Sequence, residues 1–352
     1  MTTARVPALA IVLAAACTAC GHASPLQASL RATAFVTPRL PGTAVPLVEV
    51  VAIRTLRGPA APATTVKATG GCPAGAVLLG GGISVAPMDG GTPPPSLHVD
   101  GTHPSDSAGL PAAPGTRPGA WTAVGATGGQ LVIGAGTTEF ALCARGVAAT
   151  SQIAVASVAG PASAATTARA TATCPARTSL LGGGGLTALT SRAEPSPSLH
   201  LTGSFPSGSD GSPIAVPGSA ANSWTAVADS GGRSGSGVET TAFAVCGAVG
   251  RGRTQVALSA RPGPLSPGGV TTSTASCPTG TVLLSGGVST GPATGQPQQG
   301  LHLTGSFPSS PAGDPVTASG ANANAWTARA ESGGQGSPAG TATTAFAVCL
   351  TR

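Results

Sequence analysis

Charged and aromatic residues are scarce in this sequence. Charged side chains make up 8% of its 352 residues, and Lys67 is the single lysine. Aromatic residues make up 3%, and tyrosine is absent. The formal charge of +6 comes from scattered cations that form no run or stripe, so the sequence argues against nucleic acid as a partner. Because no lysine adjoins the glycine runs, a Walker-type phosphate loop is excluded as well.

Glycine, proline and apolar residues dominate what remains. The sequence contains 53 glycines and 33 prolines, and 41% of it is hydrophobic. This composition predicts short strands joined by irregular loops, with few helices. A chain of this length can bury a core and is expected to hold two or three domains.

One pattern occurs three times along the chain. Each copy begins with Cys-Pro, continues through a glycine-rich Leu-Leu segment, a Leu-His segment and a lone Trp-Thr-Ala, and closes on Ala-x-Cys. The recurrence predicts three tandem repeats of one fold. The cysteines that bound the copies are Cys72 and Cys143, Cys174 and Cys246, and Cys277 and Cys349.

These six cysteines, two in each repeat, are predicted to form disulfides. They lack the CxxC or clustered Cys/His spacing of a metal site, so an oxidising compartment is the better interpretation. Each bond would close its own copy. In the loop-entropy model, a closed loop of about 72 residues contributes roughly 4 kcal/mol to stability.

The first 20 residues have the features of an export signal. Arg5 is followed by an apolar run at 6–16, which is too short to span a bilayer. The run ends in a segment that resembles a bacterial lipobox, in which Cys17 would carry the lipid, with Cys20 as the alternative. Residues 21–46 are interpreted as a tether. The sequence leaves open whether the protein is lipid-anchored on the outer face of the membrane or secreted.

Each repeat is expected to contain about six short strands with alternating side chains. The upstream strand precedes the first cysteine, so the units extend over 47–147, 148–249 and 250–352. Six strands with a bond from an early strand to the last suggest an antiparallel β-sandwich. Because each copy has its own disulfide and tryptophan, we expect three separate domains. The alternative is one pseudo-threefold β body in which each copy supplies a sheet.

The order Cys-Pro-x-Gly, Gly-Gly-Gly, Trp and Ala-x-Cys resembles a module common in exported proteins of high-GC Gram-positive bacteria. The resemblance covers residues 47–352. It departs from the pattern at Arg177, where the other copies have glycine, and at Ser285 in the third glycine run. It implies an exported protein or lipoprotein built of disulfide-closed β modules, and it carries no catalytic residue.

Two sets of recurring side chains are candidates for ligand binding. The tryptophans could stack on sugars, or they could be core residues beside the disulfides, which is the favoured interpretation. The histidines could form a threefold metal site only if the copies converge on one axis, so hydrogen-bonded strand residues are favoured. No metal ion or cofactor is predicted. The two sets are Trp121, Trp224 and Trp326, and His98, His200 and His302.

No catalytic set can be assembled from the sequence. The segment from Gly287 to Gly291 fits Gly-x-Ser-x-Gly, but a nucleophile elbow needs a strand, a sharp turn and a helix. The eleven acidic residues do not recur as a pair in every repeat. We therefore expect a non-enzymatic cell-envelope or secreted protein, with a binding or structural role toward an envelope glycan or surface protein. The alternative is an extracellular hydrolase that acts on envelope polymers.

Overall fold

The computed structural model describes residues 47–145, 151–189, 199–231, 237–248, 252–292, 300–334 and 336–351. The predicted signal, both lipidation candidates, Cys17 and Cys20, and the tether at 21–46 lie outside these residues. The described chain is all-β and contains eighteen strands, six in each repeat, as the sequence predicted. None of the described residues form a helix long and apolar enough to cross a membrane.

The strands follow one another in the same order in all three repeats. The first repeat contains β1 (Leu47–Arg57), β2 (Thr65–Gly71), β3 (Val77–Pro87), β4 (Leu97–Ser105), β5 (Ala120–Thr127) and β6 (Ala135–Arg145). The second contains β7 (Ser151–Ala159), β8 (Thr167–Thr173), β9 (Ser179–Leu189), β10 (Leu199–Ser207), β11 (Ser223–Ser230) and β12 (Val238–Gly247). The third contains β13 (Thr254–Pro262), β14 (Val270–Ser276), β15 (Thr281–Pro292), β16 (Leu301–Ser309), β17 (Ala325–Ser332) and β18 (Thr341–Thr351).

Each repeat is a small sandwich of two three-stranded layers. In the first repeat, β1-β6-β3 packs against β2-β5-β4. Cys72 directly follows β2 and bonds to Cys143 in β6, so the disulfide joins the two layers, with 5.8 Å between the Cα atoms. The equivalent bonds close the other two repeats. The predicted sandwich and disulfide pairing are confirmed, and three formed disulfides indicate an oxidising, extracellular environment.

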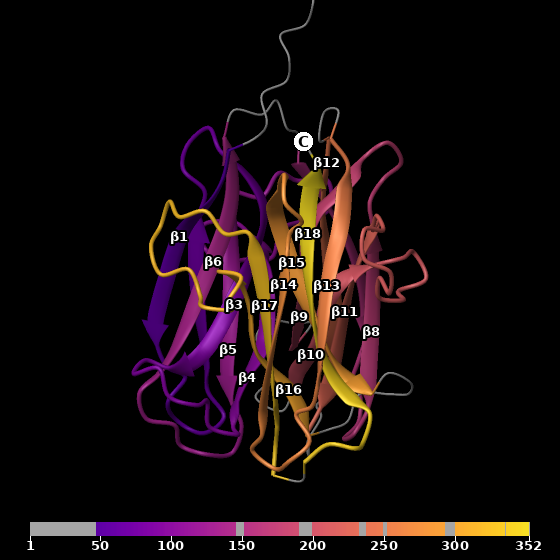
Figure 1. Cartoon of the computed structure of the whole chain (residues 1–352). Coiled ribbons are helices and arrows are strands. Elements are labelled where there is room, and N and C mark those ends of the chain that lie inside the picture. The colour runs from indigo at the N-terminus through magenta and orange to yellow at the C-terminus, as the bar shows by residue number, and fades with distance from the viewer. Residues whose placement is uncertain are drawn as a thin grey trace, which may run out of the picture. The chain divides into compact units, whose positions relative to one another are not determined.

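The repeats are not separate domains, which corrects the expectation from the sequence. Every layer continues into a layer of another repeat, which gives three six-stranded antiparallel sheets. Their strand orders are β1-β6-β3-β16-β17-β14, β13-β18-β15-β10-β11-β8 and β2-β5-β4-β9-β12-β7. The described residues belong to one compact unit, Thr43–Arg352. In the first of these sheets, β3 of the first repeat pairs with β16 of the third, and β17 follows β16; all three strands are labelled in Figure 1. The alternative, one pseudo-threefold β body, agrees better with this structure. It differs in one respect, because each sheet is built from two repeats and not from one copy.

The strands join across repeats through very short ladders. At the joint between the first and second repeats, Gly101 pairs with Leu186 and Thr102 pairs with Gly185. The same two-residue pairing links β10 to β15 and β16 to β3. A Cβ at Gly184 would overlap the carbonyl oxygen of Thr102. The glycine runs therefore permit the close strand approach that joins one sandwich to the next.

Three equivalent positions in the glycine runs meet where the repeats converge. These positions are Gly80, Gly182 and Ser285, each next to a bulge in its strand. A Cβ at Gly182 would lie 2.6 Å from the Ser285 hydroxyl oxygen, and one at Gly80 would overlap that oxygen. The space holds one small side chain, and the third repeat supplies it.

A long loop of each repeat covers the first strand of the next repeat. The loop after β4 exchanges two backbone hydrogen bonds with Ile153 of β7: Gly115 N donates to Ile153 O (2.8 Å), and Ile153 N donates to Thr116 O (3.1 Å). The loop after β10 bonds to Val256 of β13 in the same way. In the third repeat, Ser319 Oγ accepts from Ile53 N of β1, so the series closes into a ring. These loops protect strand edges that would otherwise be unpaired.

Candidate functional site

The three tryptophans are core residues and present no exposed face to a sugar. At most 1% of each side chain is exposed. Their indole N–H groups donate to the hydroxyls of Thr102, Ser204 and Ser306, at 2.8 to 2.9 Å. The stacking-platform hypothesis for Trp121, Trp224 and Trp326 is therefore wrong, because the rings fill the space between sandwich layers against glycines.

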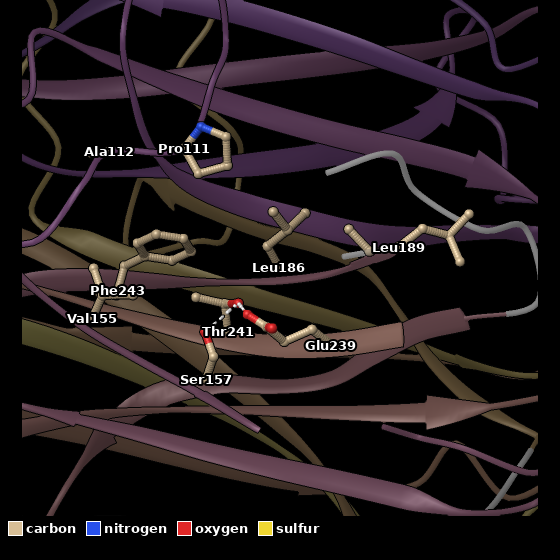
Figure 2. A pocket seen from close by; sticks show the side chains of 10 residues that line it. Pro111, Ala112, Val155, Ser157, Leu186, Leu189, Glu239, Thr241 and Phe243 are labelled. Carbon is tan, nitrogen blue, oxygen red and sulfur yellow. Dashed lines mark hydrogen bonds between the residues drawn. The ribbon is translucent and has the colours of Figure 1, made fainter. Parts of the chain in front are cut away.

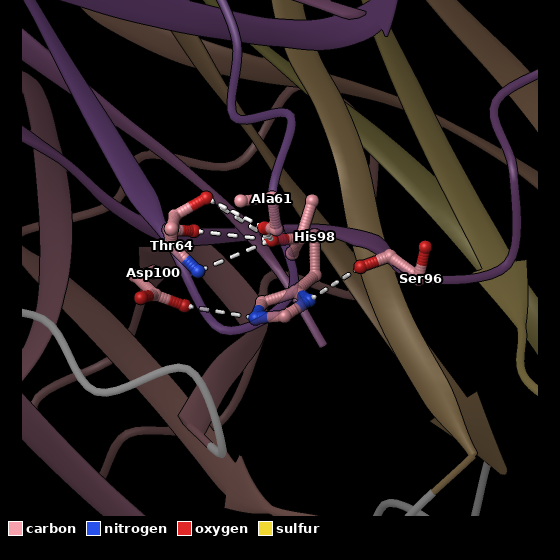
Figure 3. Close-up of polar contacts among 6 residues, drawn as sticks. Ala61, Thr64, Ser96, His98 and Asp100 are labelled. Atoms are coloured by element: carbon pink, nitrogen blue, oxygen red, sulfur yellow. Dashed lines mark hydrogen bonds and ion pairs between the residues drawn. The ribbon is translucent and has the colours of Figure 1, made fainter. Parts of the chain in front are cut away.

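The three recurring histidines converge, which the sequence did not lead us to favour. The ring centroids of His98, His200 and His302 lie 5.9 to 6.1 Å apart, edge to face, and the side chains are buried. His98 Nδ1 bonds to the backbone oxygen of Ser96 at 3.1 Å, and His98 Nε2 lies 3.4 Å from Asp100 Oδ1 (Figure 3). The Nε2 atoms of His200 and His302 have no hydrogen-bond partner among the described residues.

Burial keeps two members of this cluster, His200 and His302, uncharged. It lowers the pKa of His302 to about 3 and the pKa of His200 well below its ordinary value, and neighbouring histidines lower both further. Burial also raises the pKa of Asp100 to about 6, against the opposing effect of His98. At neutral pH, His200 and His302 are therefore neutral imidazoles.

The histidine cluster does not have the geometry of a metal site. Imidazoles that share a zinc ion at about 2 Å would have ring centroids roughly 5 Å apart, closer than those observed here. Within the described residues, no three His, Cys, Asp or Glu side chains are placed so that they could hold a metal ion. The cluster is thus a buried polar contact between the three repeats.

Burial strongly perturbs two acidic side chains, Glu139 and Glu331. Burial raises the pKa of Glu139 to about 9, against the effect of Arg54, and that of Glu331 to about 8, against the effect of Arg329. Ser289 of the Gly-x-Ser-x-Gly segment lies within β15, where it pairs with Thr344 and Gly203. The segment is a paired strand, so it does not form the sharp turn of a nucleophile elbow.

One of the three joints between repeats differs from the other two in its aromatic contact. Phe205 stacks on Phe346 and Phe307 stacks on Phe140, with centroids 5.8 and 6.0 Å apart. At the joint between the first and second repeats, His103 takes the phenylalanine position and stacks on Phe243 at 5.5 Å. Burial lowers the pKa of His103 to about 4. This joint therefore combines a neutral imidazole with an aromatic ring.

A groove of about 230 Å³ lies at the same joint. Pro111 and Ala112 of the first repeat form one wall, across from the second repeat's β7, β9 and β12 (Figure 2). Most of the lining is apolar, and Glu239 supplies its single charged group. The lining residues are Pro111, Ala112, Val155, Ser157, Leu186, Ala188, Leu189, Glu239, Thr241 and Phe243.

The polar side of the groove is a short chain of hydrogen bonds. The Thr241 hydroxyl lies 3.2 Å from Glu239 Oε1, to which it donates, and 2.9 Å from the Ser157 hydroxyl. Glu239 is half-buried, and its cross-strand neighbours are the small residues Ala159 and Ala188. The carboxylate is thus accessible beside an apolar surface.

The residues that create the groove are special to this joint. Ala112 follows Pro111, and its counterparts after the equivalent prolines are Ile214 and Val316, which both pack against the core. Glu239 is replaced by Gly136 in the first repeat and Ala342 in the third. Leu186 is replaced by Ser84 and Ser289. The small side chain of Ala112 leaves the groove open, and Glu239 and Leu186 line it.

A second hollow, of about 380 Å³, lies where the second repeat meets the third. Its lining consists mainly of small and polar residues, with Arg253 as the charged group. It offers few side chains for a specific contact, so the groove beside Ala112 is the stronger candidate.

Comparison with protein-family models found no matching family, and comparison with curated proteins found no match. The candidate site therefore depends on the geometry of this chain alone. Sequence reasoning missed the groove because its residues come from two repeats, although Ala112 and Glu239 do break the repeat pattern.

Proposed function

We propose that this protein is an exported, non-enzymatic binding protein of the cell envelope, and that the groove beside Ala112 is its binding site. The signal-like first 20 residues support export, with Cys17, or alternatively Cys20, as the lipid-bearing residue of a membrane-anchored form. Secretion without an anchor is the alternative. The disulfides support an extracellular location.

The observation that carries this proposal is the departure of one joint from threefold equivalence. Three repeats with the same strands and disulfides differ at the groove in side-chain size, charge and aromatic type. A rigid β scaffold with one distinct concave site is a common arrangement for binding. A role as a spacer would not require such a site.

The proposal is tested with the exported, oxidised protein and a panel of envelope polysaccharides and purified envelope proteins. The Ala112→Ile variant places in the groove the side chain that the next repeat has at this position. Val216→Ala, at a side chain that is 65% exposed, is the matched control.

We expect saturable binding to one panel member, weakened at least tenfold in Ala112→Ile at unchanged melting temperature and retained in Val216→Ala. Binding that survives Ala112→Ile overturns the proposal, and so does the absence of binding to every panel member. Whether the binding that Ala112→Ile weakens is to a polysaccharide or to a protein identifies the class of partner.

A further inference from the structure

The groove has a size suited to one side chain. Sites that enclose a whole small molecule usually measure about 300 to 1,000 Å³. At about 230 Å³, this groove is smaller. Pockets of this kind on protein surfaces commonly receive a single anchoring side chain from a larger partner.

The lining of the groove indicates the chemistry of that side chain. Val155, Leu186 and Leu189 offer an aliphatic surface, and Glu239 places a carboxylate at the polar side. No cation is among the lining residues to neutralise this carboxylate. A lysine or arginine side chain matches both parts, because its methylene stem packs on apolar residues while its charged end reaches an acid.

Resting on the proposed function, we propose that the groove receives a lysine or arginine side chain of a protein partner. The aliphatic stem lies against Leu186 and Leu189, and the cationic end bonds to Glu239, which Thr241 holds in place through its hydroxyl. Recognition by charge also explains why the acid occurs in the repeat that has the open groove and in neither counterpart position.

The test uses small amides that each present one side chain to the full-length protein. The probes are N-acetyl-lysine methylamide, the arginine equivalent and the uncharged norleucine equivalent. Binding is followed through the methyl resonances of Val155, Leu186 and Leu189. The variants are Glu239→Gln, which removes the charge at constant shape, and Ala112→Ile, which fills the groove.

We expect the lysine or arginine probe to shift these resonances and to bind with at least tenfold higher affinity than the norleucine probe. Glu239→Gln should reduce that affinity to the norleucine level, rising salt should weaken it, and Ala112→Ile should abolish it.

Two results overturn the inference. If norleucine binds as tightly as lysine and Glu239→Gln leaves the affinity unchanged, the charge argument is wrong. The proposed function still stands in that case if Ala112→Ile abolishes the binding. If no probe shifts the resonances, the inference fails, and the panel experiment with Ala112→Ile decides the proposed function separately.

Discussion

The imidazole of His103 stacks on the ring of Phe243 where the two equivalent joints have phenylalanine on phenylalanine. The joint between the first and second repeats is therefore the one whose aromatic stack contains a histidine. Its pKa, lowered by burial from 6.5 to about 4, links this contact to pH.

His103→Phe is expected to make stability less sensitive to acid. Because the folded-state pKa of His103 is lowered, its stabilising contribution is present above pH 6.5 and is lost as pH falls toward 4. At about 1.4 kcal/mol per pKa unit, the loss is roughly 3 kcal/mol. Denaturant unfolding at pH 7 and pH 4.5 measures it. An equal acid loss in the variant and the parent protein contradicts the prediction.

His302→Gln is expected to have a similar effect at the histidine cluster. The folded-state pKa of about 3 means that the unfolded chain takes up a proton below pH 6.5 that the folded chain does not. Glu331 opposes His302 on the neighbouring strand, but its raised pKa leaves it protonated in this range. Between pH 6 and 4.5, the free energy of unfolding should therefore fall by about 1.4 kcal/mol less per pH unit in the variant than in the parent protein. Thermal unfolding over this range measures the difference, and parallel curves refute it.

Glu139→Gln is expected to stabilise the protein at alkaline pH. The folded-state pKa of Glu139 is raised to about 9, so the folded chain holds a proton that the unfolded chain releases above pH 4.5. Its contribution to stability therefore falls as pH rises toward 9. A glutamine lacks this titration, so the variant should unfold at a higher temperature than the parent at pH 8.5, with a smaller difference at pH 5. A constant difference at both pH values would show that the effect is not due to ionisation.

Removing one disulfide is expected to weaken the whole unit. Cys174→Ser with Cys246→Ser opens a loop with a sequence separation of 72 residues, which costs about 4 kcal/mol. Because each sheet spans two repeats, we expect a single unfolding transition at lower temperature in calorimetry. The same pair of changes at Cys277 and Cys349 is the matched control and should give a similar loss. Separate transitions for the repeats would contradict the shared-sheet architecture.

The space shared by Gly80, Gly182 and Ser285 provides a test by exchange. Gly80→Ser alone should destabilise the protein by roughly 1–3 kcal/mol, because its side chain overlaps Ser285. The double variant Gly80→Ser, Ser285→Gly should recover most of this loss, since one hydroxymethyl group again fills the space. Chemical denaturation of the two single variants and the double variant measures the coupling. Additive losses would mean that the two positions do not share this space.

Much of the local structure could be predicted from the repeats themselves. Alternating small and β-branched residues indicate six strands per copy, and the spacing of Cys72 and Cys143 indicates an intra-repeat bond. The favoured interpretation of Trp121 as a core residue also agrees with its burial. These features depend on neighbours within one repeat, so a single copy contains the necessary information.

The contacts between repeats could not be predicted in this way. His98, His200 and His302 lie about a hundred positions apart, and their approach depends on how the sheets continue from one sandwich into the next. The two-residue ladders that join the repeats leave no periodic signal in the sequence. Likewise, Ala112 and Glu239 belong to different repeats and share a groove only after folding.

The sequence by itself determined the all-β class, the three repeats, the strands and the disulfide pairs, because alternation and cysteine spacing act over short distances along the chain. Only the tertiary structure decided that the repeats share their sheets, that the histidines meet and that one joint opens into a groove. Those outcomes depend on the packing of side chains from different repeats, where the volume of Ala112 or Ser285 matters more than any local propensity.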